Sequence, residues 1–105
     1  MAVTAGGIAL LIPRGPEPIE QTITRSGIYE IGCDGCDMGA GTWRTVGDDP
    51  RDGVCMWARK TTRAPSAEHV IAEGRVRPGE TATVRMSPGE WFTTMWCGPW
   101  ERVAR

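Results

Sequence analysis

Apolar and polar residues alternate in short segments along most of the chain, and turn-forming residues separate these segments. The clearest example is residues 81–86, in which Ala82, Val84 and Met86 alternate with Thr83 and Arg85. A period of two residues is typical of a half-buried β-strand. No window of a dozen residues carries an apolar helical stripe that is free of Gly and Pro. The pattern therefore predicts an all-β domain.

Seven segments have the length and composition of strands. They are residues 21–24, 27–31, 42–46, 54–60, 69–76, 81–86 and 91–96. We expect segment 69–76 either to be interrupted at Gly74 or to begin with a brief helical turn. Short strands that recur about every ten residues favour an antiparallel β-sandwich or a small barrel. The expected domain has about seven short strands and covers residues 22–105.

Two Pro-Gly pairs, Pro78-Gly79 and Pro88-Gly89, are spaced by ten residues, and a Glu follows each of them. Pro and then Gly at the two central positions are typical of a type II turn. Because an alternating segment follows each pair, we expect the last third of the chain to form an antiparallel meander.

Residues 1–21 differ from the rest of the chain, because they are rich in Pro and Gly and contain no cysteine. Closely spaced prolines hold the backbone extended and block strand pairing within the domain. We therefore expect an extended N-terminal arm that docks on a neighbouring subunit by strand addition. Its alternating apolar residues, Ile8, Leu10 and Ile12, would supply the side-chain contacts. A disordered tail is the alternative.

The composition supports the strand interpretation and narrows the choice of partners. Val and Ile together number 14 and Thr numbers 11, whereas Leu occurs only 2 times. β-branched side chains suit a pleated sheet better than a helix.

The formal net charge of −1 argues against nucleic acid or an anionic membrane as a partner reached through bulk charge. The longest apolar run, residues 8–12, is far short of the ~20 residues that a transmembrane helix needs.

The first residues do not have the pattern of a secretion signal. No basic segment precedes the apolar run, and Pro-rich sequence follows it where a cleavage site would lie. We therefore expect a chain that is made in the cytoplasm and is not exported by the general route. The 4 cysteines are nevertheless many for a reducing compartment, so a functional hypothesis must accommodate both observations.

Five short motifs follow one another between Gly27 and Trp100: "GTWRT", "CMWAR", "VIAEG", "PGE" and "CGPW". In this order they resemble a small Cys- and Trp-containing β-domain of actinobacterial secreted proteins and lipoproteins, which also occurs in actinobacteriophage genomes. The resemblance implies a fold more than an activity. Two features depart from it, since the secretion signal or lipobox is absent and Cys33 and Cys36 are additional.

Cys55 and Cys97 lie in the most specific part of the resemblance, "CMWAR" and "WCGPW", and we predict a disulfide between them. The bond would close a loop of about forty residues and stabilise the domain by roughly 3–4 kcal/mol. Two buried free thiols, or another pairing, are the alternatives.

The "CDGC" segment at residues 33–36 is open to three interpretations. A redox site is disfavoured, because no helix follows and Asp34 and Asp37 would raise the thiol pKa. A zinc site is disfavoured because a second paired motif is missing. Its four ligands would be Cys33, Cys36, Cys55 and Cys97. We favour a tight loop in which Gly35 permits the turn and the two sulfurs are joined as a second disulfide or free, and we expect no metal.

Other polar residues give no strong catalytic or metal signature. Five aspartates gather in two loops, as in some calcium sites: Asp34, Asp37, Asp48, Asp49 and Asp52. Their spacing matches no known calcium loop, and Asp is a common turn residue. Ser66 and Glu68 lie near the single histidine, His69, but no nucleophile-elbow pattern surrounds Ser66. We therefore expect no catalytic residue and no cofactor.

The 5 tryptophans are a large aromatic content for a chain of 105 residues. We expect Trp57, next to the "CM" pair, to lie in the core. Exposed tryptophans serve protein interfaces or stack on sugar rings, and Trp91, Trp96 and Trp100 are the candidates for such a platform. The alternative is that nearly all the tryptophans fill a leucine-poor core.

Together these features favour a non-enzymatic structural protein of a bacteriophage virion, made in the host cytoplasm. It would be a capsid decoration or minor capsid protein, or a tail component. It would form a homo-oligomer and bind other virion subunits, such as the major capsid or tail protein, through its N-terminal arm, without a nucleic-acid or membrane partner. One alternative is a secreted or cell-surface module that binds carbohydrate or cell wall through exposed Trp. Another is a cytoplasmic zinc-bound adaptor.

Overall fold

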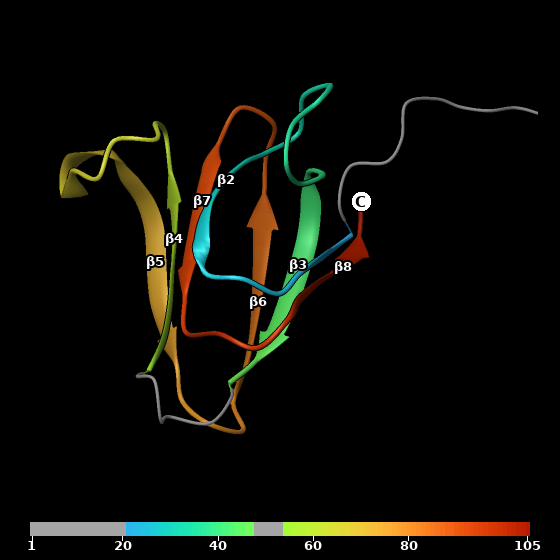
Figure 1. Cartoon of the computed structure of the whole chain (residues 1–105), viewed down its shortest axis with the longest axis vertical. Coiled ribbons are helices and arrows are strands. Elements are labelled where there is room, and N and C mark those ends of the chain that lie inside the picture. The colour runs from blue at the N-terminus through green and yellow to red at the C-terminus, as the bar shows by residue number, and fades with distance from the viewer. Residues whose placement is uncertain (1–20, 48–53) are drawn as a thin grey trace, which may run out of the picture.

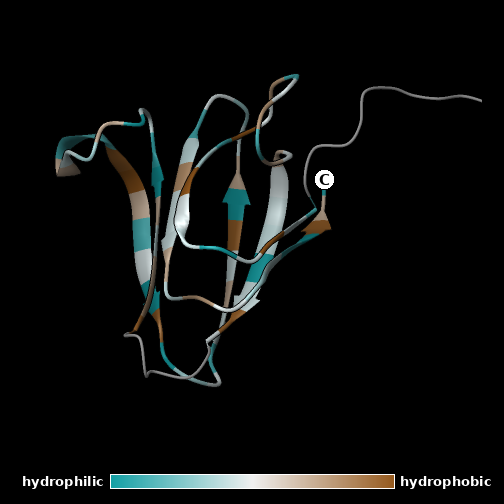
Figure 2. Cartoon of the chain, in the orientation of Figure 1, coloured by the Kyte–Doolittle hydropathy of each residue, from teal (hydrophilic) through white to brown (hydrophobic). Residues whose placement is uncertain are grey.

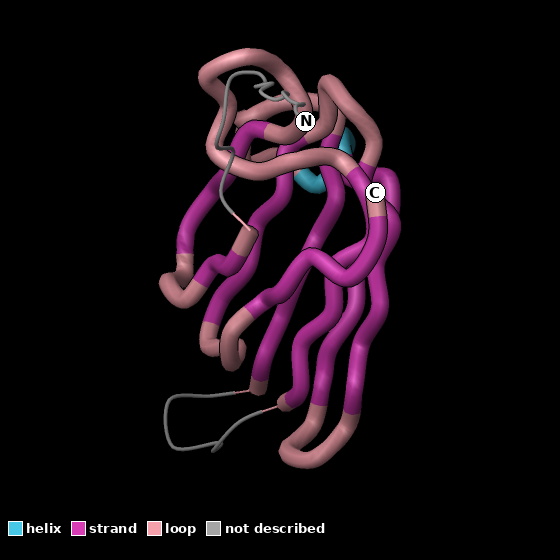
Figure 3. The backbone as a smooth tube through the Cα atoms, turned by 90° about the vertical axis from the view of Figure 1, so that its right-hand side faces the viewer, coloured by secondary structure: helices cyan, strands magenta, loops and turns pink. Residues whose placement is uncertain are grey.

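The computed structural model describes residues 21–47 and 54–105, which form two four-stranded antiparallel sheets packed face to face (Figure 1 and Figure 3). We call them the β3 sheet, with strand order β1-β8-β3-β6, and the β7 sheet, with strand order β2-β7-β4-β5. The strands are β1 (Thr22–Ile23), β2 (Gly27–Glu30), β3 (Gly41–Val46), β4 (Cys55–Lys60), β5 (Val70–Val76), β6 (Thr81–Met86), β7 (Trp91–Met95) and β8 (Trp100–Ala104). The predicted all-β sandwich is confirmed, with eight strands rather than about seven.

Of the two alternatives expected for residues 69–76, the interruption at Gly74 is wrong, and a brief helical turn does precede the strand. A single 3-10 turn, Ala67–His69, precedes β5, and the strand then continues through Gly74 without interruption. Gly74 lies opposite Trp57 of β4, and a Cβ atom added there would lie 2.8 Å from the Trp57 indole nitrogen. The glycine therefore makes room for a large neighbour instead of breaking the strand.

Both Pro-Gly pairs form the predicted type II turns, but the predicted meander is wrong. Gly79 and Gly89 have positive φ angles of 84° and 90°, as the third position of this turn requires. The turns lead from β5 in the β7 sheet to β6 in the β3 sheet and then back to β7. Type II turns splay the flanking strands, whereas tight hairpins use the mirror-image types. Here the Pro-Gly turns are therefore corners between sheets.

Large side chains from both sheets meet in the core. Trp43 of β3 and Trp100 of β8 enter from the β3 sheet, and Phe92 of β7 enters from the opposite side. The rings of Phe92 and Trp100 meet edge to face, with 5.0 Å between centroids, the arrangement that aromatic quadrupoles favour. Figure 2 shows the alternation that produces this core, with hydrophobic and hydrophilic residues taking turns along β6. Aromatic rings thus fill a core that contains almost no leucine.

Each buried indole N–H has a hydrogen-bond acceptor. The Trp43 Nε1–H donates to the Gly39 carbonyl (2.9 Å). The Trp100 Nε1–H donates to Oγ1 of Thr94 (2.8 Å), a residue of β7 in the opposite sheet. The second bond links the two layers through groups that are fully enclosed, so its loss would leave a buried donor without an acceptor.

Parts of two predictions lie outside the described residues. The N-terminal arm with Ile8, Leu10 and Ile12 is one. The acidic loop with Asp48, Asp49 and Asp52 is the other. Among the residues that are described, no helix has the length and apolar character needed to cross a membrane.

Replacing Thr94 by Val should destabilise the domain by about 1–3 kcal/mol, because it removes the acceptor of the Trp100 N–H without changing side-chain shape much. Chemical denaturation followed by tryptophan fluorescence measures the change. Thr93→Val is the matched control on the same strand, and its side chain faces away from the core. We expect this control to stay within about 0.5 kcal/mol of the parent chain. Equal losses for the two variants would contradict the role given to the buried bond.

Candidate functional site

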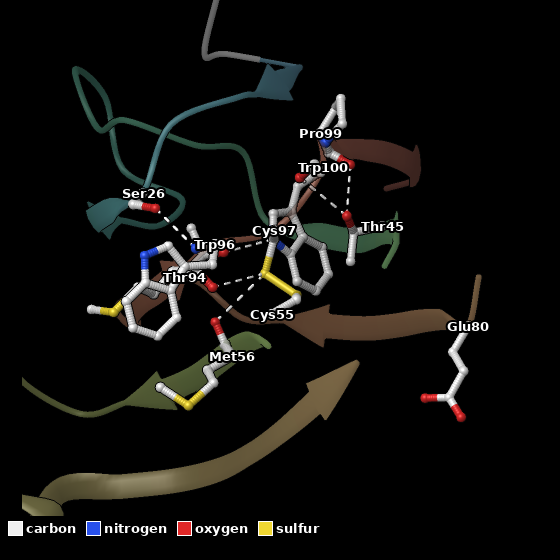
Figure 4. Close-up of a disulfide and its surroundings, with 12 residues drawn as sticks. Ser26, Thr45, Cys55, Met56, Glu80, Thr94, Trp96, Cys97, Pro99 and Trp100 are labelled. Atoms are coloured by element: carbon white, nitrogen blue, oxygen red, sulfur yellow. Dashed lines mark hydrogen bonds between the residues drawn. A yellow bond between two sulfur atoms is a disulfide. The ribbon is translucent and has the colours of Figure 1, made fainter. Parts of the chain in front are cut away.

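The predicted disulfide between Cys55 and Cys97 is present, with a Cα–Cα distance of 4.4 Å. Cys55 begins β4, and Cys97 lies in the segment 96–99 that crosses from β7 to β8. The bond therefore links strand β4 of the β7 sheet to the segment through which the chain passes from the β7 sheet to the β3 sheet (Figure 4).

Cys33 and Cys36 form the second disulfide. The favoured tight loop is confirmed, because the Cys36 N–H donates to the Cys33 carbonyl (3.0 Å) and Gly35 has a φ of 77°. Asp37 has a turn role as well, since its carboxylate accepts the Glu30 N–H (2.9 Å). With all four cysteines paired as disulfides, the thiolates that the zinc arrangement needed are absent.

The crossing segment 96–99 has further contacts that fix it (Figure 4). The Thr45 hydroxyl, on β3, donates to the carbonyls of Pro99 (2.8 Å) and Gly98 (3.2 Å). At the other end the Trp96 N–H donates to Oγ of Ser26 (3.0 Å), between β1 and β2. The segment is therefore attached to both sheets and to the connection before β2.

Trp96 is exposed on this fixed segment in an unfavourable backbone conformation. Its φ is 60°, and it is the one non-glycine residue with positive φ in the described part of the chain. The left-handed region costs an ordinary residue roughly 1–2 kcal/mol, and a bulky residue there is a true outlier. Its side chain is 44% exposed. A strained, exposed tryptophan held by a disulfide and hydrogen bonds is the kind of feature found at functional sites.

The three tryptophans predicted to form a platform do not lie together. Trp100 is only 1% exposed and packs against Phe92 in the core, so its place in the platform was wrong. The physical reason is that it begins β8 with its side chain turned inward, and in Figure 4 the Trp96 and Trp100 indoles lie on different sides of Cys97. Trp91 is half-buried, and the Arg63 guanidinium lies 5.8 Å from its ring centroid.

The outer face of the β7 sheet gathers apolar side chains. Because Trp57, Phe92 and Thr94 turn toward the core, their neighbours along β4 and β7 turn outward. Ile28 is 40% exposed and Met95 is 38% exposed on this side. We define the apolar face as Ile28, Met56, Ala58, Trp91, Thr93 and Met95.

The apolar face is continuous across neighbouring strands and contains a hollow. Met56 lies opposite Met95, Ala58 lies opposite Thr93, and Thr93 also lies opposite Ile28 on the next strand. The small Ala58 side chain leaves a shallow depression of about 310 Å³ beside it. Its outward-facing lining is Met56, Ala58, Glu73, Arg75, Thr93 and Met95.

The outer face of the β3 sheet has a different character. Its outward residues are mainly threonine and arginine, with Thr42 opposite Arg85 and Arg44 opposite Thr83. Val46 is exposed at the end of β3, and Val103 is exposed near the end of β8. Single exposed valines are normal on a protein surface. The two sheets are therefore alike inside and different outside.

A charged pair supports the β7 strand next to Trp91. The Arg59 guanidinium contacts the Glu90 carboxylate through two hydrogen bonds of 2.9 Å and 2.5 Å. Although burial acts to raise the pKa of Glu90, the Arg59 hydrogen bond and the Ser87 N–H keep that pKa below its ordinary value. The paired carboxylate also holds the Pro88-Gly89 corner, because it accepts the Ser87 N–H (3.2 Å).

The remaining sequence candidates have local structural roles. Ser66 caps the 3-10 turn before β5 by accepting the Glu68 N–H (3.1 Å), and His69 accepts the Thr61 N–H with its carbonyl. Sequence reasoning missed the apolar face, although a signal existed. In "CMWAR" and "EWFTTM", an inward Trp57 and Phe92 imply that Met56 and Met95 point outward.

Comparison with known proteins relates the chain to one described family. The family model of the Rv1352-like extracellular domain matches residues 21–101, which include every described strand except the end of β8. No curated protein and no solved structure matches the chain significantly.

Replacing Cys55 and Cys97 together by Ala should cost about 4 kcal/mol, because the bond closes a long loop in the unfolded chain. Replacing Cys33 and Cys36 together is the matched control, and its short loop should make the loss about 2 kcal/mol. Urea denaturation of both double variants measures the two losses. A loss at Cys33 and Cys36 as large as that at Cys55 and Cys97 would contradict the ranking.

Proposed function

Because the chain belongs to the Rv1352-like extracellular domain family, we propose that it is a secreted or cell-surface binding module without enzymatic activity. It docks a partner protein through the apolar face, with Trp96 at the end of β7 as an anchor. The family description supports the location outside the cell. The observation that carries the proposal is the difference between the outer faces of the two sheets.

Burial requirements within the domain do not explain the apolar face. One face of an antiparallel sheet can be solvated, and such faces usually carry polar residues, as the β3 sheet does. The β7 sheet instead presents methionine, isoleucine and tryptophan side chains to solvent. Met and Trp are enriched at the centres of protein interfaces, and contiguous exposed apolar patches mark interaction sites. The face therefore has the composition of an interface core.

Trp96 supports a docking role through its rigidity. Its backbone is fixed by the neighbouring disulfide and by the bond to Ser26, so little backbone freedom is lost when a partner binds. Tryptophan is also the residue most enriched among binding hot spots. Strain that is kept at an exposed tryptophan is consistent with selection for binding over stability.

A carbohydrate- or cell-wall-binding module is the second candidate, because an exposed indole also stacks on sugar rings. Trp96 is the observation that favours it. The flat row of aromatic rings that this function was expected to use is not formed, since Trp100 is buried and Arg63 lies over Trp91. A sugar site would therefore rest on one indole.

The structural role in a virion stays a prediction, as does docking through residues 1–21, most of which lie outside the described residues. The two modes of docking can be separated. Deleting residues 1–20 would remove binding through the arm. The deletion would keep Gln21, whose carbonyl accepts the Arg102 N–H, and binding through the apolar face would be unchanged.

Two substitutions on the β7 side should weaken binding of the purified chain to intact cells of the producing bacterium by roughly tenfold or more. Met95→Glu places a charge on the apolar face, and Trp96→Asn removes the indole while suiting the left-handed backbone. Val46→Glu is the matched control, since Val46 is 48% exposed on the β3 sheet. Trp96→Asn should melt at or above the parent temperature, because the strain is relieved.

The same assay distinguishes the partner classes. Protease treatment of the cells should abolish binding if the partner is a protein. Undiminished binding to deproteinised cell walls that still depends on Trp96 would support the carbohydrate module instead. Equal losses for Met95→Glu and Val46→Glu, or no loss for either Met95→Glu or Trp96→Asn, would contradict the proposal.

A further inference from the structure

The β5 strand forms a long free edge of the sandwich. It spans seven residues, Val70–Val76, and lies at the end of the β7 sheet with β4 as its neighbour in the described part of the chain. The other edge of this sheet, β2, has four residues, and the two edges of the β3 sheet, β1 and β6, have two and six. The one register shift in the β4–β5 ladder lies at Lys60, opposite the start of β5. Ile71 is skipped at that shift, so residues 72–76 are a regular strand whose outer row of backbone groups is open to another strand.

Two charges of opposite sign point outward from this edge. Glu73 and Arg75 are exposed, and the residues that face them on β4 are the uncharged Ala58 and Met56. Neither Glu73 nor Arg75 takes part in an ion pair with any other residue of the described regions. Charged side chains on an edge strand usually discourage pairing with a second strand, because like charges that come to lie opposite each other are destabilising. An acidic and a basic residue two positions apart on one face do not repel an antiparallel copy of the same strand. In that copy the order of the two charges is reversed, so opposite charges can lie across from each other.

We propose that a second copy of this chain pairs with β5 in antiparallel register, about a two-fold axis at Gly74. In this register Glu73 lies opposite Arg75 of the second copy, and Arg75 lies opposite Glu73 of the second copy. Both contacts are opposite-charge cross-strand pairs. Such an interface is isologous, because each copy contributes the same strand. The result is a continuous eight-stranded sheet.

The charge pattern favours this register over registers in which the two-fold axis passes through another residue of β5. Opposed residues of a continuous sheet share a face, so the axis must pass through a residue and not between two residues. An axis at residue 73 would place two glutamates opposite each other, and an axis at residue 75 would oppose two arginines. An axis at Ala72 would set Ile71 against a glutamate and Arg75 against His69. The axis at Gly74 alone satisfies both charges.

The centre of the proposed interface is suited to close approach. Gly74 has no side chain, and the Trp57 indole fills the space under it on the core side. Two copies of Gly74 therefore meet at the axis without a steric obstacle, as is common where backbones approach closely.

The pairing places two apolar faces side by side on one surface. A partner with two matching sites, or a repetitive cell surface, would then be bound with an avidity that a single copy lacks. The dimer does not depend on the proposed function, since its interface is the strand edge and not the apolar face. Its test therefore needs no binding partner.

Sedimentation velocity of the full chain over a series of concentrations tests the inference. The parent chain should dimerise, and Glu73→Arg or Arg75→Glu alone should weaken dimerisation by roughly tenfold to a hundredfold, because each replaces two attractive pairs by two repulsive ones. An equimolar mixture of the two single variants should dimerise again. In the mixture, every Arg of one variant meets a Glu of the other.

Arg85→Glu is the matched control, because Arg85 is an exposed arginine on β6, the free edge of the β3 sheet. It should leave dimerisation within about twofold of the parent chain, and circular dichroism should show that all variants are folded. Three results would overturn the inference: a parent chain that stays monomeric at the highest concentration, single variants that dimerise like the parent, or a mixture that does not recover dimers.

Discussion

The disulfide between Cys55 and Cys97 fixes the place where the chain leaves one sheet for the other. Only residues 96–99 separate β7 from β8, so the crossing between layers is short. The bond holds one side of this crossing to β4, and the Thr45 hydroxyl holds its end to β3. Because these contacts oppose relaxation, Trp96 stays in a left-handed conformation with its indole in solvent. The exposed anchor is thus a consequence of how the two layers are joined.

The packing of the two layers explains why one outer face is free to serve another purpose. Trp43, Phe92 and Trp100 fill the space between the sheets, and the N–H of each tryptophan has a buried acceptor. The buried core is therefore built from the inward residues, and the outward residues of the β7 sheet lie outside it. Rigid strands keep the backbone ordering cost of binding low, and flexible methionine side chains supply adaptability. This combination suits a surface that must accept a partner.

Alternation along the chain was enough to predict β1 to β7 and the sandwich, because it reports which residues share a face, but β8 was not predicted. Alternation does not report which of two sheets a strand joins. The Pro78-Gly79 and Pro88-Gly89 turns were therefore predicted with the right geometry and the wrong connectivity. Trp100 was misplaced for a related reason, since its neighbours in sequence do not show that β8 begins there with an inward side chain.

The disulfide between Cys55 and Cys97 was predicted because the resemblance singled out both residues. Alternation indicates that Met56 and Met95 each point outward, but it does not indicate that they lie together on one apolar face. Residues such as Met56 and Met95 become neighbours only when β4 pairs with β7, at a sequence separation that no local pattern spans.

The methionines allow a direct test of the proposal that a partner covers the apolar face. Met56 and Met95 lie on that face, whereas Met38 and Met86 are buried in the core. Oxidation by hydrogen peroxide, read for each methionine by mass spectrometry, can be compared between the free chain and the chain bound to cells of the producing bacterium. We predict that Met95 is oxidised several-fold more slowly in the bound chain, while Met38 and Met86 are protected in both states. Equal oxidation of Met95 in the free and bound chain would contradict it.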